Sequence, residues 1–113
     1  MQHATPSRRL TLRVDAPIPV WVCWCCEGRE NVSRVRNLSL GGLFLETSVT
    51  QPVGIKATLD FLVQEGQIRA DAVVRHATAT GGLGLKFLAI KEADRPNLAA
   101  LVSRLHSLLA SPR

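Results

Sequence analysis

The chain has 113 residues, of which 46% are apolar and 20% charged, and a net charge of +5. This length predicts one domain, and this near-average composition excludes a disordered tail protein. No apolar run reaches the ~18 residues that a membrane span needs, and residues 1–13 lack the apolar stretch of a secretory signal. We therefore expect a soluble, cytoplasmic protein without membrane insertion.

Residues 1–17 are polar and basic, are interrupted by Pro6 and Pro17, and predict a flexible leader. Six short segments rich in strand-forming residues follow, separated by Gly or Pro turns. They predict strands at 18–26, 32–36, 43–46, 55–63, 67–77 and 83–90. Such a series is typical of a small antiparallel barrel or sandwich, and a small sheet protects its edges best by closing on itself. We assign residues 18–91 to this unit.

The last segment, 92–113, changes to helical spacing. Its apolar residues form one stripe: Leu98, Leu101, Val102, Leu105, Leu108 and Leu109. Asp94 is the predicted N-cap, with Pro96 in the first turn. We expect this helix to pack on the barrel, which gives an all-β fold with a C-terminal helix; a stripe offered to a partner is the alternative.

The strand around Trp21–Cys26 is loaded with Trp and Cys. Three cysteines without histidines at ligand spacing predict free thiols and no metal site. Trp21 and Trp24 are three residues apart, so they must lie on opposite faces of a strand. We expect one in the core and the other exposed, where it could mark a partner or self-association surface.

The chain offers no residues for catalysis. Its acidic residues are scattered, no histidine has a convincing nucleophile beside it, and Gly81-Gly82-Leu83-Gly84 is not followed by the helix of a dinucleotide loop. We therefore predict that the protein is not an enzyme.

Two motifs remain. Arg9 and Arg13 form Arg-x-x-x-Arg in the leader, and residues 37–42 form Asn-x-Ser-x-x-Gly after the second predicted strand. Eleven of the 14 basic residues are arginine, whose planar donors match phosphate and the guanine edge. The second motif also fits an Asx-type turn with glycine at positive φ, so its residues alone leave function open.

The two motifs in this order, with the late Gly84–Phe87 strand before a C-terminal helix, resemble the PilZ domain. This resemblance implies a six-stranded antiparallel barrel and a bacterial receptor for cyclic di-GMP. The ligand-binding residues that it implies are Arg8, Arg9, Arg13, Asn37, Ser39, Gly41 and Gly42.

The resemblance also implies roles for these residues. Arg9 and Arg13 would clamp the phosphates and the O6/N7 edge of guanine, and Asn37 and Ser39 would bind the other side of the ligand. Gly42 would let the backbone come close. Arg8 resembles the residue of members that take up an intercalated ligand dimer.

Together these expectations describe a non-catalytic receptor that needs no cofactor and passes a motility or biofilm signal to an unidentified downstream protein. Ligand binding would pass on the signal by ordering residues 1–17. One alternative is a PilZ-like adaptor of pilus or flagellar control that binds no nucleotide. The other is a small basic barrel for single-stranded nucleic acid, which the scarcity of aromatic residues disfavours.

Overall fold

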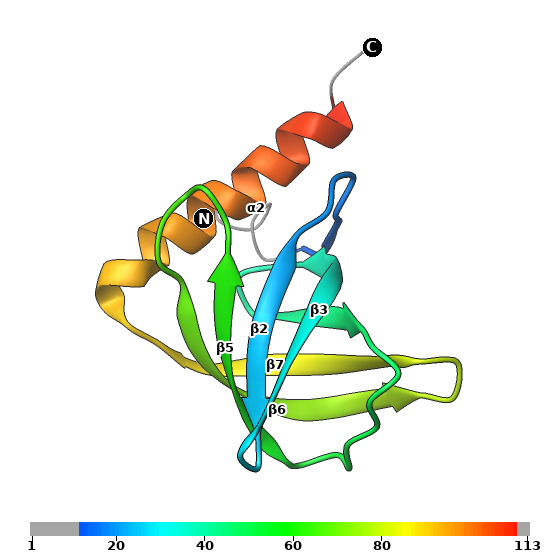
Figure 1. Ribbon diagram of the computed structural model, residues 1–113. Coiled ribbons are helices and arrows are strands. Elements are labelled where there is room, and N and C mark those ends of the chain that lie inside the picture. Colours follow the sequence, from blue (N-terminus) through cyan, green and yellow to red (C-terminus); the bar gives the residue numbers. More distant parts are fainter. Residues whose placement is uncertain (1–11, 111–113) are drawn as a thin grey trace, which may run out of the picture.

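The computed structural model describes residues 12–110 (Figure 1). The strands are β1 (Val14–Asp15), β2 (Trp21–Cys26), β3 (Arg29–Leu38), β4 (Gly42–Glu46), β5 (Lys56–Leu62), β6 (Arg69–Thr78) and β7 (Gly82–Ile90). A short 3-10 helix, η1 (Glu92–Asp94), leads into the helix α2 (Arg95–Ala110). Within the described range, no helix is long and apolar enough to cross a membrane.

The sheet closes into a barrel. Its strand order is β3-β2-β5-β6-β7-β4, and β4 pairs again with β3, so that every neighbouring pair is antiparallel. β1 adds two residues to β3 outside this circuit. The predicted six-stranded antiparallel barrel is confirmed, and β1 is a further strand that the sequence did not predict.

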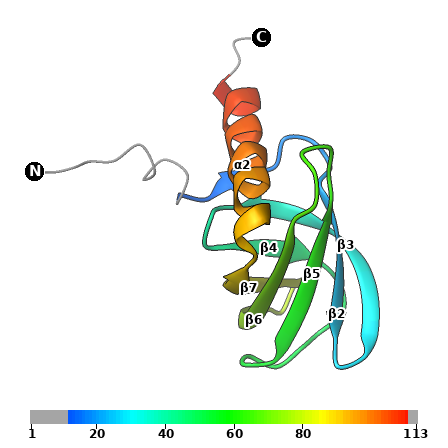
Figure 2. The same cartoon turned by 90° about the vertical axis from the view of Figure 1, so that its left-hand side faces the viewer.

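The barrel interior is filled by alternate residues of the strands and by one stripe of α2. Four helical side chains join the buried core: Leu98, Leu101, Val102 and Leu105. Leu108 and Leu109, in the last turn, are exposed. Figures 1 and 2 show α2 at the β1 end of the barrel, on one side of the sheet. The helix thus packs on the barrel through the first part of the predicted stripe.

β2 has one tryptophan on each face, as predicted. Trp24 is fully buried and its indole Nε1 donates a hydrogen bond of 2.9 Å to the Ser33 hydroxyl. Trp21 lies on the outer face and is 45% exposed. Cys26 is buried, its thiol lies 3.5 Å from the carbonyl oxygen of Lys56, and burial raises the pKa of this thiol.

The structure corrects two boundaries. β3 runs from Arg29 to Leu38, beyond both ends of the predicted strand 32–36. It begins early because Glu27 and Gly28 take positive φ and close a two-residue hairpin with β2. It ends late because its last residues pair with β1. The end of the predicted leader also pairs with the sheet, since β1 lies within residues 1–17. Residues 1–11 of that leader lie outside the described residues, so the proposed division of the chain stays a prediction.

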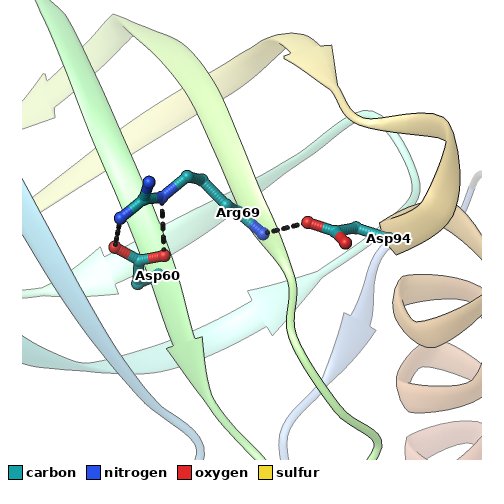
Figure 3. A network of polar contacts seen from close by, with 3 residues as sticks. All are labelled: Asp60, Arg69 and Asp94. Carbon is teal, nitrogen blue, oxygen red and sulfur yellow. Dashed lines mark hydrogen bonds and ion pairs between the residues drawn. The ribbon is translucent and has the colours of Figure 1, made fainter.

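Asp94, the predicted N-cap, is the last residue of η1, and the hydrogen bond of its side chain goes to the barrel. It is buried, and its carboxylate accepts a hydrogen bond of 3.1 Å from the backbone N–H of Arg69 at the start of β6. The side chain of Arg69 in turn binds both carboxylate oxygens of Asp60 on β5 (Figure 3). These bonds fix the start of the helix to the barrel wall.

Candidate functional site

The two sequence motifs meet at the β1–β3 pairing. Arg13 comes immediately before β1, and Asp15 of β1 lies opposite Asn37 of β3. The Arg13 Nη1 donates a hydrogen bond of 2.9 Å to the Asn37 Oδ1, although the residues are 24 positions apart in the chain. Both side chains lie on the surface, where a ligand can reach them.

Ser39 builds the turn between β3 and β4. Its side chain is buried, with the Oγ accepting a hydrogen bond from the Gly41 N–H at 3.1 Å and donating to the Gly42 carbonyl at 3.4 Å. Its own N–H donates to that carbonyl at 2.9 Å. Neither Gly41 nor Gly42 has positive φ. The glycine conformation suggested for this turn from the sequence is therefore wrong.

Gly42 is required by the packing of two strands. It lies opposite Lys86 in the β4–β7 pairing, and a Cβ at this position would overlap the carbonyl oxygen of Leu85. A Cβ on Gly41 would lie 3.8 Å from the Ser39 Oγ, which is an ordinary contact. The last glycine of the motif is therefore needed for the close pairing of β4 and β7.

A surface cavity of about 340 Å3 lies beside the turn. It is lined by Arg13, Ser39, Gly41, Arg75, His76, Gly84, Leu85 and Lys86. Its size falls within the range of small-molecule sites. The lining contains three cationic side chains and no carboxylate, so the cavity suits an anion.

Five of these residues were not predicted as site residues from the sequence: Arg75, His76, Gly84, Leu85 and Lys86. β6 and β7 bring them to the motifs because the barrel closes between β7 and β4. Arg75 is the extra residue of a β-bulge, since Val74 pairs with Leu85 and His76 pairs with Gly84. A bulge re-aims a side chain, and the strand register that creates it carries no signal in the sequence.

The strand register places Gly84, one of the cavity-lining residues, between Phe44 and His76. Across the sheet, Asn37 pairs with Phe44, Phe44 with Gly84, and Gly84 with His76. A Cβ on Gly84 would lie 3.2 Å from the Cβ of His76 and 3.7 Å from the Phe44 ring. Gly84 is itself buried, so the side chains of Phe44 and His76 already occupy the space beside it.

Two other hollows are slightly larger and less suited to an anion. The hollow of about 410 Å3 at Cys25 is lined by Lys56 together with two acids, Glu27 and Asp71. The hollow of about 420 Å3 at Leu40 pairs Arg95 with Glu92. Charge therefore distinguishes the cavity at Arg13 from both.

The predicted site residues divide into three groups. Arg13, Ser39 and Gly41 line the cavity, and Asn37 contacts Arg13. Gly42 lies in the strand behind them. Arg8 and Arg9 lie outside the described residues. Among residues 12–110, no three side chains of the His, Cys, Asp or Glu types are arranged to hold a metal ion.

Comparisons with known proteins agree on one family. The family model of the PilZ domain matches residues 7–104. The PilZ domain of YcgR from Escherichia coli, in a structure with cyclic di-GMP, is 18% identical with a TM-score of 0.68, over 87% of this chain and 91% of that one. No curated protein sequence matches the chain.

Two further solved structures share the fold. The Bacillus subtilis inhibitor of motility, MotI (DgrA), is 20% identical with a TM-score of 0.71, and all of this chain covers 55% of that one. The PilZ domain of CeSA from a cellulose-synthesising bacterium is 15% identical with a TM-score of 0.66, over 84% of this chain and 98% of that one.

Proposed function

The chain belongs to the PilZ domain family, and on this premise we propose that it is a non-catalytic receptor for cyclic di-GMP. The ligand is the second messenger itself, and no cofactor takes part. The receptor acts in the cytoplasm and passes the signal to another protein.

The observation that carries this proposal is the contact between Arg13 and Asn37 at the rim of a basic cavity. It joins the two family motifs, one before β1 and one at the end of β3. An arginine and an amide already held side by side lose little conformational freedom when a ligand arrives. The solved PilZ domain of YcgR with cyclic di-GMP gives the ligand class.

The chemistry of the cavity fits this ligand. Cyclic di-GMP carries two phosphate charges and two guanines, each with paired acceptors at O6 and N7. The Arg13 guanidinium can bind either group with two parallel hydrogen bonds, and Arg75 and Lys86 add positive charge. A guanine in this cavity would be within reach of His76 and of the Asn37–Arg13 pair.

The signal leaves the domain through its leader. We extend the proposal to Arg8 and Arg9, which precede Arg13 and would add two cations to the bound ligand. The expected ordering of the leader on binding is narrowed to the part that precedes β1, because Val14–Asp15 already pairs with β3. Hydrogen exchange of this part, with and without saturating ligand, tests the idea. Unchanged exchange there would contradict the switch while leaving binding intact.

We also propose the process that the receptor regulates, on the basis of its structural neighbours. One structural neighbour is an inhibitor of motility and another comes from a cellulose-synthesising bacterium. Control of motility or of biofilm material, through a protein partner, is consistent with both.

Calorimetric titration of cyclic di-GMP tests the receptor function. Wild type should show saturable binding, and Arg13→Ala should weaken it by about 10- to 100-fold, since one good arginine pair contributes about 1–3 kcal/mol. Arg29→Ala is the matched control, because Arg29 is an exposed arginine at the distal β2–β3 hairpin. Its affinity should equal that of wild type.

Each outcome of the titration is informative. An absence of heat with about 50 μM wild type, where even ~10 μM affinity would show, overturns the receptor and favours the adaptor that binds no nucleotide. Equal losses in Arg13→Ala and Arg29→Ala would mean that binding is diffuse charge attraction rather than recognition at this cavity.

A further inference from the structure

The outer face of β2 is apolar where a barrel strand normally meets water. Val22, Trp24 and Cys26 point into the core, and the outward residues are Trp21, Cys23 and Cys25. Antiparallel strands with one solvated face usually alternate apolar and polar residues, whereas runs apolar on both faces are typical of strands covered on both sides. The sequence of β2 therefore indicates that something covers its outer face.

Neighbouring strands extend this apolar surface. Trp21 lies opposite Leu62 of β5, and Cys23 lies opposite Val32 of β3. Leu62 is 56% exposed and Val32 is 59% exposed. We call this surface the β2 face and define it by Trp21, Cys23, Cys25, Glu30, Val32, Arg34, Thr58, Asp60 and Leu62.

Two opposite charges flank Val32 along the β3 border of the face. Glu30 pairs with Cys25 and Arg34 with Trp21 in the strand register, so the charges lie at the two ends of the face. Both side chains are exposed, and neither forms an ion pair with another residue of the described range. Asp60, on the β5 border, is by contrast held by Arg69 at 3.0 and 3.1 Å.

The two ends of the β2 face also differ in relief. Trp21 and Leu62 project at one end. The other end lies beside the hollow of about 410 Å3. This hollow is lined in part by three short side chains, those of Cys25, Thr58 and Ala89. Four residues along a strand separate the projecting end from the hollow end, which is about 13 Å.

We propose that the β2 face binds a second copy of this chain in a two-fold symmetric dimer. The axis lies in the interface along the row Val32–Cys23–Asp60. Rotation about this row places Glu30 against the partner's Arg34, and Arg34 against the partner's Glu30. The same rotation places the projecting Trp21 over the hollow end of the partner.

A second copy fits better than an unrelated partner because the face is complementary to itself. A two-fold interface requires that if one residue meets a second, the second meets the first. The Glu30–Arg34 contacts and the relief of the face satisfy this condition, and the two Asp60 carboxylates that meet on the axis are each held by Arg69 of their own chain. The β2 face consists of residues from only three strands, so the area that it can bury is smaller than the ~800 Å2 per partner of a standard interface. We therefore expect a weak dimer with a Kd of about 10–100 μM.

Charge reversal tests the proposal in the full chain without ligand, by sedimentation equilibrium from about 5 to 500 μM. Wild type should dimerise, and Glu30→Arg and Arg34→Glu should each weaken association at least tenfold, because like charges then meet twice. The double variant should recover dimerisation, and an equimolar mixture of the two single variants should form a heterodimer. Unchanged circular dichroism would establish that each variant is folded.

A size change tests the same dimer independently of charge. Trp21→Ser should reduce association at least tenfold, whereas Val53→Ser, which removes an exposed apolar side chain outside the β2 face, should leave it unchanged. A monomer at every concentration overturns the proposal. So does a dimer that survives both Trp21→Ser and the single charge reversals, because it would use another face.

Discussion

The cavity at Arg13 and the β2 face lie on the outer surface of the same barrel but are built in opposite ways. In the cavity region, polar side chains are already bonded to one another: Arg13 to Asn37, and Ser39 to the backbone of its own turn. On the β2 face, Glu30 and Arg34 are exposed at a distance from each other, with apolar side chains between them. The first region is organised before any ligand arrives, whereas the second is complete only when another surface covers it.

This difference decides what a substitution will do. In the cavity region, motif residues are part of the scaffold, so their loss changes the stability of the domain as well as binding. On the β2 face, Glu30 and Arg34 at the β3 border form no ion pair with another described residue, so substitutions at these two positions should change association alone. The predictions below separate these two behaviours, beginning with the largest expected effect.

Gly42→Ala should cost the most. The added methyl would overlap the Leu85 carbonyl oxygen, so that β4 and β7 must move apart. We expect the free energy of unfolding to fall by about 2–3 kcal/mol, as is usual for overpacking. Urea denaturation measures it. Gly41→Ala is the matched control, because its Cβ meets only the Ser39 Oγ at 3.8 Å, and it should change stability by less than ~0.5 kcal/mol. Equal effects at the two glycines would contradict the structural role of Gly42.

Ser39→Ala should have the next largest effect. The substitution leaves the Gly41 N–H without its acceptor in a turn where Ser39 is only 4% exposed. A buried group that loses its partner costs about 1–3 kcal/mol, and we expect the lower half of this range because Gly41 itself is exposed. Thermal unfolding followed by circular dichroism measures the loss. Ser103→Ala, at an exposed position of α2, should not lower the melting temperature, because alanine is the better helix former. A melting temperature of Ser39→Ala equal to that of wild type would show that water replaces the hydroxyl.

The same contrast explains how far the sequence could predict the molecule. Alternation and turn residues predicted the barrel strands, and the motifs predicted Arg13 and Asn37, because these are local signals. Arg75 and His76 reach the cavity only through a β-bulge and the closure between β7 and β4, and neither register is encoded locally. β1 was missed because a two-residue strand has no period to detect.

Arg75→Ala tests whether the cavity extends beyond the motifs. Arg75 lines the cavity but makes no hydrogen bond or ion pair within the described residues, so its loss should leave stability unchanged. The affinity for cyclic di-GMP should fall by about 5- to 10-fold, as expected for one phosphate contact at the surface. Calorimetric titration of Arg75→Ala, with Arg29→Ala as the control, measures the change in affinity. Wild-type affinity in Arg75→Ala would restrict recognition to the motif residues.

The smallest effect concerns a charge pair that already has its partner. Arg104 of α2 donates a hydrogen bond of 3.1 Å to Glu65, whose side chain is 8% exposed, and this bond holds the pKa of Glu65 below its ordinary value. A lowered carboxylate pKa stabilises the fold at pH above the ordinary value of about 4.3, and the stabilisation is lost as pH falls through the lowered pKa.

Glu65→Gln should therefore lower the free energy of unfolding by about 1 kcal/mol at pH 7. The difference from wild type should shrink progressively below pH ~4.3. Urea denaturation from pH 7 down to about pH 3 measures it. Glu30→Gln is the control at low protein concentration, where the chain should be monomeric: Glu30 has no ion pair within the described residues, so its difference from wild type should stay near zero throughout. A pH-dependent loss in Glu30→Gln would mean that Glu30 already stabilises the monomer. The claim that the charged residues of the β2 face have no partner within the monomer would then be wrong, and with it the difference between the two regions.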